Sequence, residues 1–240
     1  MLELQQPELQ VKSKQRVTDH GEVYTSPREV NAMLDLVKQE TERIDSRFLE
    51  PACGTGNFLA EILRRKLEVV AKKYCKSRIE FECYTVIAVS SIYGIDILED
   101  NVIQCRKRLL DICTDVLKTT DAEAEFISAQ TPQVGQEQGQ VLPLQFTIEF
   151  ILSKNIIWGD ALTLQTVSEN PQPITFSEWS PINGSMIKRR DFTFDELIYH
   201  SDKGKMPLFS DTGEGVFIPE PVKEFPPVHY REIANMEGER

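Results

Sequence analysis

The residues with the clearest potential for chemistry lie in one short stretch, Glu-Pro-Ala-Cys-Gly-Thr-Gly-Asn-Phe at positions 50–58. Gly54 and Gly56 lack a Cβ atom, so the backbone there can approach a ligand closely. A short strand is predicted just before the stretch and a helix from Asn57, and the first N–H groups of a helix are free to face a ligand. The alternative is a strand-to-helix turn without a ligand.

Two aspartates follow apolar runs that are predicted to end as buried strands. Asp96 follows Ile-Tyr-Gly-Ile, and Asp160 follows Asn-Ile-Ile-Trp-Gly. A carboxylate at a strand end can accept hydrogen bonds from both hydroxyls of a ribose, which suits Asp96. Each aspartate could instead only close a turn. Leu59 stands where a dinucleotide-binding loop needs its third glycine, so the pattern disfavours a nicotinamide-dependent oxidoreductase.

Four segments resemble, in the same order, the cofactor motifs of adenine-specific (N6) DNA methyltransferases, especially those of restriction–modification systems. They are residues 21–27, 50–58, 93–96 and 155–162, which read GEVYTSP, EPACGTGNF, YGID and NIIWGDAL. The resemblance implies a Rossmann-like fold and transfer of a methyl group from S-adenosylmethionine to an adenine amine. It also implies a cofactor-binding set of Tyr24, Thr25, Glu50, Pro51, Ala52, Gly54, Gly56, Asn57, Phe58, Asp96, Ile97, Asp160 and Ala161.

Within this set the resemblance implies particular contacts. Thr25 would help to hold the methionine carboxylate, and Glu50 would lie near the amino group of the same moiety. Asp96 would bind the ribose hydroxyls, and Asp160 would meet the exocyclic amine of the cofactor's adenine. Thr25 could instead simply precede the cap of the next helix.

The family's target-base motif, a polar residue followed by Pro-Pro and an aromatic residue, is not recognisable. The only Pro-Pro pair is flanked by Phe225 and Val228, and Ser180-Pro181 has a single proline. No catalytic residue can therefore be assigned. The interpretation is the cofactor-binding part of a DNA adenine-N6 methyltransferase whose base-gripping motif comes from a partner, as in a split methyltransferase or a restriction subunit. The alternative is a catalytically inactive S-adenosylmethionine-binding regulatory or partner subunit.

The charge balance also favours a partner for DNA binding. Lysine and arginine total 27 against 38 acidic residues, so the formal net charge is −11. Duplex DNA is bound largely through neutralised phosphates, which needs a basic surface. The local candidates are the clusters at residues 64–66 and 188–190, and the alternative for both is an ordinary solvated face.

The elements that must position these residues alternate between strands and helices. Ser26, Pro27 and Glu29 predict a capped helix start, and strands are predicted at residues 47–50, 92–96 and 155–158. Helices are predicted from Asn57 and over residues 100–117. This order is typical of an α/β fold with a mostly parallel sheet.

The rest of the chain is predicted to be peripheral. Residues 1–20 would be a flexible arm and 21–200 the methyltransferase-like domain, interrupted by a mobile, Gln-rich insertion at 119–145. Asn183-Gly184 predicts a β-hairpin over residues 174–194, followed by a short helix at 194–200. Residues 201–240, rich in proline, would form an extended tail over the surface.

Composition suggests a cytoplasmic protein. The five cysteines have neither metal-ligand spacing nor a paired rhythm, so reduced thiols and no metal site are expected. No apolar run approaches the roughly 20 residues of a membrane span. The polar N-terminus does not resemble a secretory signal.

Overall fold

The computed structural model describes residues 13–20, 22–128, 144–198, 208–209, 215–216 and 219–236. Its central sheet has the order β1-β2-β3-β4. Strands β1 (Phe48–Glu50), β2 (Ile92–Asp96) and β3 (Ile156–Asp160) run parallel, and β4 (Gln165–Thr166) runs antiparallel to β3. The predicted α/β class is confirmed, but the sheet is mixed and a second, antiparallel sheet accompanies it.

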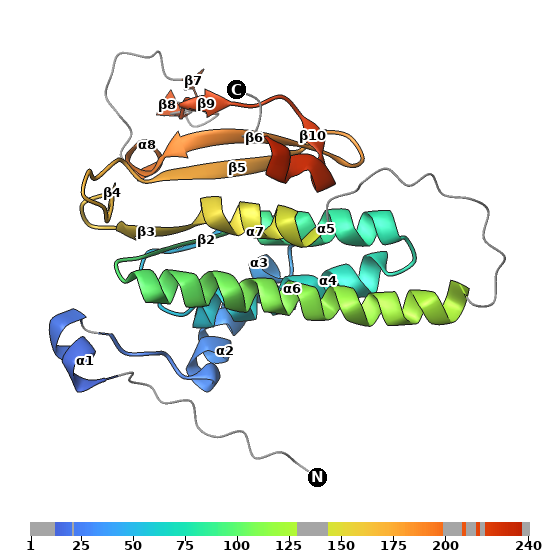
Figure 1. Cartoon of the computed structure of the whole chain (residues 1–240), viewed down its shortest axis with the longest axis horizontal. Helices are drawn as coiled ribbons and strands as arrows, with labels where there is room; N and C mark the ends of the chain where they lie inside the picture. Colours follow the sequence, from blue (N-terminus) through green and yellow to red (C-terminus); the bar gives the residue numbers. More distant parts are fainter. Residues whose placement is uncertain are drawn as a thin grey trace, which may run out of the picture.

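Two helices stand between each pair of parallel strands. These are α4 (Asn57–Tyr74) and α5 (Arg78–Ser90) before β2, then α6 (Glu99–Ser128) and α7 (Leu144–Asn155) before β3. Figure 1 shows α4 and α6 in the lower layer, with α5 and α7 above them. The core lies among these helices and the sheet, because their apolar side chains, such as Leu63, Val89 and Leu109, are fully buried.

The helix before the glycine loop begins as predicted and is interrupted after Asp35. The side-chain hydroxyl of Ser26 accepts a hydrogen bond from the amide of Glu29, and the Glu29 carboxylate accepts one from the amide of Ser26. The two bonds form a complete capping box. The helix divides into α2 (Pro27–Asp35) and α3 (Lys38–Thr41). Val37 lies at this break and is 45% exposed.

Helix α5 was not predicted, because the apolar stretch before β2 was interpreted only as an approach to a strand. Ser77 caps this helix by accepting from the amide of Glu80. Phe81, Val86 and Val89 are fully buried. A helix that is apolar on several sides shows no clear period, so its pattern cannot be told from that of a buried strand.

The predicted mobile insertion at 119–145 is wrong at both ends. Helix α6 continues to Ser128, and α7 already begins at Leu144. The remaining residues, 129–143, lie outside the described part of the chain. Residues 119–128 at the start of this stretch have few large apolar side chains and were therefore included in the insertion, yet Ala and Glu, which both occur twice there, are strong helix formers.

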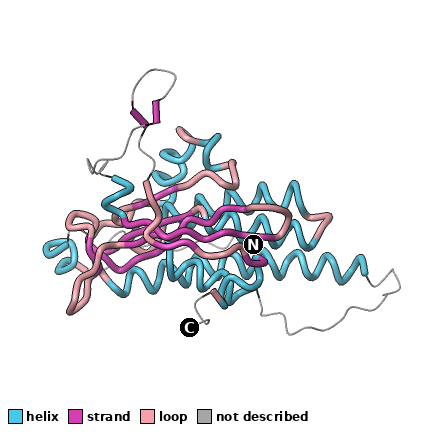
Figure 2. Tube along the Cα trace, turned by 90° about the horizontal axis from the view of Figure 1, so that it is seen from above, coloured by secondary structure: helices cyan, strands magenta, loops and turns pink. Residues whose placement is uncertain are grey.

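The predicted hairpin is confirmed and belongs to a second sheet. Strands β5 (Thr175–Pro181) and β6 (Met186–Thr193) pair antiparallel, followed by α8 (Phe194–Ile198). The connecting loop runs from 182 to 185, and only Gly184 has a positive φ, 56°. A two-residue Asn-Gly turn would need a positive φ at Asn183 as well, but this loop is longer and does not. Figure 2 shows these strands lying over the helices.

The C-terminal region is not a tail that only covers the surface. Short strands β9 (Lys223–Glu224) and β10 (Val228–His229) both pair with β6. The 3-10 helix η1 (Tyr230–Asn235) then buries Tyr230 and Ile233. A two-residue pair, β7 (Leu208–Phe209) with β8 (Gly215–Val216), completes the described strands. The rest of residues 201–218 and residues 237–240, part of the predicted tail, lie outside the described residues, as do residues 199 and 200 of the predicted short helix.

Two further features bear on protein class. No helix in the described part of the chain is long and apolar enough to cross a membrane. Across the described side chains, no cluster of three or more His, Cys, Asp or Glu residues is placed to hold a metal ion.

Lys66 is a fully buried charged side chain in the core. Its amine donates to the carbonyl oxygens of Ile44 and Ser46 and to the hydroxyl of Ser91. Burial lowers the pKa of this amine from 10.5 to about 7. The amine thus links the loop before β1 to the end of α5. Because its pKa is lowered, it loses its proton at a lower pH than an exposed lysine does.

The buried amine should make stability depend on pH. Between the folded pKa of about 7 and the unfolded value of 10.5 the unfolded chain binds the extra proton, so stability should rise with pH across this window. We expect the wild-type protein to gain stability relative to Lys66→Met as the pH rises, measured by urea unfolding. Lys72→Met, at an exposed position of the same helix, should show no such trend. Parallel curves for wild type and Lys66→Met would contradict the assignment.

Candidate functional site

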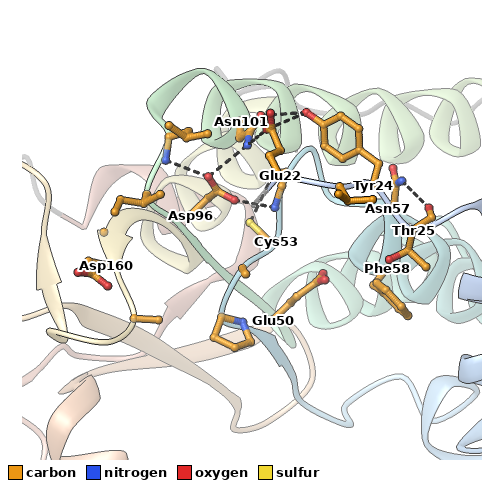
Figure 3. A pocket seen from close by; sticks show the side chains of 18 of the residues that line it. Glu22, Tyr24, Thr25, Glu50, Cys53, Asn57, Phe58, Asp96, Asn101 and Asp160 are labelled. Carbon is orange, nitrogen blue, oxygen red and sulfur yellow. Dashed lines mark hydrogen bonds between the residues drawn. The ribbon is translucent and has the colours of Figure 1, made fainter. Parts of the chain in front are cut away.

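A cavity of about 520 Å³ lies at the carboxyl ends of β1, β2 and β3 (Figure 3). It brings together residues from all four motif-like segments. The predicted residues that line it are Tyr24, Thr25, Glu50, Pro51, Ala52, Gly54, Asn57, Phe58, Asp96, Ile97, Asp160 and Ala161. Gly56 is the one member of the predicted set that does not line it.

Gly56 has a packing role beneath the loop. It has a φ of 81°, and a Cβ atom there would lie 2.6 Å from Sγ of Cys105 on α6. Gly54, with a φ of 53°, faces the cavity, where an added Cβ would lie 3.3 Å from the ring of Tyr24. The two glycines therefore serve different purposes, one for packing against α6 and one for the cavity wall.

Asp96 joins the glycine loop to the start of α6. One carboxylate oxygen accepts from the amide of Gly54 at 2.8 Å. The other accepts from the amide of Leu98 at 2.9 Å and from Nδ2 of Asn101 at 3.2 Å. The bond from Leu98 is the turn that was considered as an alternative, but the bond from Gly54 also fixes the cavity wall.

Glu50 is half-buried, and its carboxylate points into the cavity (Figure 3) with a buried Oε2 atom. Its Oε2 atom has no hydrogen-bond partner among the described residues. Burial, followed by the nearby charge of Asp96, raises the pKa of this carboxyl to about 8. A buried acceptor without a donor is costly unless a bound group supplies the donor, so Glu50 is poised to receive one.

Asp160 and the apolar side chains of Ile97 and Leu162 lie at the rim of the cavity. Asp160 accepts from the amide of Leu162 at 2.8 Å, which closes the turn after β3. Leu162 is 94% exposed and Ile97 is 47% exposed. The indole of Trp158 donates to the carbonyl of Ile97 at 3.0 Å and so ties β3 to the loop after β2. At this rim, the exposed side chains of Ile97 and Leu162 offer apolar surface to a flat ring, and the carboxylate of Asp160 lies beside them.

The segment before α2 forms the opposite wall. Nδ2 of Asn57 donates to the carbonyl of Thr25 at 3.0 Å, and Oδ1 of Asn57 accepts from Arg108. Asn57 therefore uses its side chain to hold the Thr25 segment against α4, although it was predicted as a ligand residue. The hydroxyl of Tyr24 donates to Glu22 at 3.0 Å and lies 3.3 Å from Oδ1 of Asn101.

Sequence reasoning missed several residues of the cavity, namely Glu22, Val23, Cys53, Leu98, Asn101, Gly159 and Leu162. Several of these flank predicted positions and could have been included on that ground. Asn101 has no such signal, because it reaches the cavity only through the fold.

The nearby arm was predicted to be flexible over residues 1–20. Residues 1–12 lie outside the described part, but α1 (Lys14–His20) docks here through Arg16.

The lining of the cavity is acidic. Glu22, Glu50, Asp96 and Asp160 contribute carboxylates, and no lysine or arginine occurs among its described residues. Such a cavity favours a ligand that carries positive charge and hydrogen-bond donors. It disfavours a dinucleotide, whose pyrophosphate would meet like charge.

The basic cluster at residues 188–190 is neutralised within the second sheet. Lys188 pairs with Glu224 at 2.8 Å, and Arg190 pairs with Glu178 at 2.7 Å. Arg189 is buried and pairs with Asp191 at 2.8 Å. In the other cluster Arg64 pairs with Glu61 at 3.7 Å, Arg65 pairs with Asp35 at 2.9 Å and Lys66 is buried. Neither cluster offers an unpaired basic face of the kind that DNA phosphates require.

The Pro-Pro segment serves the same sheet. Phe225 is buried, its amide donates to the carbonyl of Arg189 at 3.0 Å, and its ring lies 4.3 Å from the Arg189 guanidinium. Val228 pairs with β6. None of these residues lines the cavity.

No family model, curated protein or solved structure matches this chain.

Proposed function

We propose that the chain is the S-adenosylmethionine-binding component of a cytoplasmic DNA adenine-N6 methyltransferase with a Rossmann-like fold. The observation that carries the proposal is the convergence of four separate sequence segments around one acidic cavity, with the unpartnered Glu50 carboxylate inside it. The volume of about 520 Å³ lies within the range of small-molecule sites.

The residues of the cavity fit the groups of this cofactor. Glu50 would accept a hydrogen bond from the ammonium group of the methionine moiety, since its buried Oε2 atom needs a donor. Asp96 would accept from the ribose, and Asp160 from the adenine amine between Ile97 and Leu162. The cofactor supplies an electrophilic methyl group on a sulfonium ion, and the four carboxylates of the lining suit its positive charge.

We assign recognition of the target adenine in DNA to a partner subunit. A flipped adenine needs acceptors for its amine and a ring on which to stack. The Pro-Pro segment of this chain is used in the second sheet, and the side chains of both basic clusters are paired or buried. A second subunit would therefore supply both the base-gripping motif and the basic surface for DNA.

The same observations support a second candidate, a catalytically inactive subunit that binds S-adenosylmethionine and regulates a modification or restriction complex. The two candidates differ in whether a methyl group leaves this chain's cavity for DNA. Activity of the chain together with its partner subunit separates them.

The purified chain is expected to bind S-adenosylmethionine and not NADH in calorimetry, because the acidic lining repels a pyrophosphate. It is expected to transfer no tritiated methyl group to mixed-sequence duplex DNA by itself, since misplacement of a reacting group by about 1 Å costs roughly 100-fold in rate. Tight NADH binding without S-adenosylmethionine binding would refute the proposal. Robust N6-methyladenine formation by the chain alone would refute the need for a partner.

A further inference from the structure

A continuous chain of hydrogen-bonded side chains runs from helix α1 to the glycine loop. It passes from Arg16 through Glu22 and Asn101 to Asp96, which accepts from the amide of Gly54. Figure 3 shows the part of this chain that faces the cavity, from Glu22 through Asn101 to Asp96. The members come from four separate segments, so the chain is a tertiary device and not a local turn.

Arg16 spans two elements with its guanidinium group. Nη1 donates to Oδ2 of Asp100 at 2.8 Å, and Nη2 donates to Oδ1 of the same residue at 3.1 Å. Nη2 also donates to Glu22 at 2.9 Å, and Nε makes a second bond to that carboxylate. The planar, multidentate geometry holds both carboxylates in a defined orientation, as a lysine could not.

Glu22 transmits this contact to the cavity. Its side chain is only 7% exposed, and it accepts from Nδ2 of Asn101 at 2.7 Å and from the hydroxyl of Tyr24. Burial would raise the pKa of this carboxyl, but the bonds from Arg16, Asn101 and Tyr24 outweigh burial and lower it. Without Arg16, the buried Glu22 carboxylate would keep only the neutral donors of Asn101 and Tyr24.

We propose that the described residues 14–20 and 22–24 act as a clip across the cavity, with Arg16 as the positioning residue that sets Glu22, Asn101 and Asp96 for cofactor binding. The inference rests on the proposed function and adds a regulated element to it. Arg16 does not line the cavity itself and acts through two residues that do, chiefly Glu22 and also Asn101, whose Oδ1 lies 3.3 Å from Nη2 of Arg16. Displacing the clip, by a partner or by high salt, would lower cofactor affinity without changing any residue that touches the cofactor.

The test compares Arg16→Gln with Lys14→Gln, which removes the same charge from the same helix. Arg16→Gln is expected to weaken S-adenosylmethionine binding about 10-fold in calorimetry, the scale of one lost charge-assisted hydrogen bond. Lys14→Gln should leave binding within about 2-fold. Melting temperatures of both variants show whether the fold is intact. Equal binding by wild type and Arg16→Gln would overturn the proposal.

A double-mutant cycle separates positioning from general destabilisation. If Arg16 acts through Glu22, then Arg16→Gln should add less than about 2-fold to the effect of Glu22→Gln. Fully additive effects would overturn the route through Glu22.

A ligand-free measurement keeps the clip testable if the proposed function fails. Hydrogen exchange at the amides of Gly54 and Leu98, both bound to Asp96, should accelerate in Arg16→Gln and not in Lys14→Gln. If the wild-type chain binds no S-adenosylmethionine, the proposed function is wrong, while accelerated exchange would still support the clip. Unchanged exchange would refute it.

Discussion

Glu50→Gln is expected to weaken S-adenosylmethionine binding by about 10- to 100-fold, the range for losing a hydrogen bond to a charged group. The Oε2 atom of Glu50 has no partner among the described residues, so the ligand's ammonium would be its donor. The carboxyl has a pKa of about 8, and only its ionised form attracts a cation. Wild-type affinity should therefore rise between about pH 6 and pH 8, whereas the variant should show a flatter profile in calorimetry.

The same substitution should have the opposite effect on stability. The folded pKa of Glu50 is about 8 and its ordinary value is 4.5, so its stabilising contribution is complete below 4.5 and is lost as the pH rises through 8. Glu50→Gln removes this loss, so the variant should be more stable than the wild type under alkaline conditions. Glu68→Gln, at an exposed position of α4, serves as the control. A variant that loses both binding and stability would mean that Glu50 is a structural residue.

Tyr230→Ala is expected to destabilise the fold by about 3–5 kcal/mol, as for other fully buried aromatic residues. Tyr230 is 1% exposed. Its hydroxyl donates to Glu82 at 2.8 Å, and its carbonyl accepts from Thr147 at 3.2 Å. For a chain of this size the melting temperature should fall by roughly 10 °C.

Asn235→Ala provides the control, because Asn235 is exposed in the same helix η1. Its melting temperature should stay within about 2 °C of wild type. If Tyr230→Ala behaved like this control, the C-terminal region would be the loosely attached tail that its composition suggests. Thermal unfolding followed by circular dichroism measures both.

Local signals predicted the elements around the cavity well. Ser26, Pro27 and Glu29 specify their helix start within four residues, and the glycines at 54 and 56 mark the turn after β1. The aspartates at 96 and 160 were placed at strand ends because apolar runs stop there. In each case neighbouring residues carry the information.

Features that depend on distant partners were not predictable. Asn101 reaches the cavity because Glu22, 79 positions earlier, packs beside it. Helix α5 is apolar on several sides because it lies among α4, α7 and β5. The prolines after Pro219 suggested an extended tail, but β6 offers that segment strands to pair with. A pattern read along the chain contains none of these partners.

The contact between Tyr230 and Glu82 also has a consequence for the order of folding. It closes a loop of 148 positions, and the entropy cost of such closure precedes any gain from the contact. The parallel strands and their helices join shorter stretches of chain and can form first. Refolding is therefore expected to pass through a species in which β9, β10 and η1 are still undocked, and Tyr230→Ala should slow the final step while leaving earlier steps unchanged.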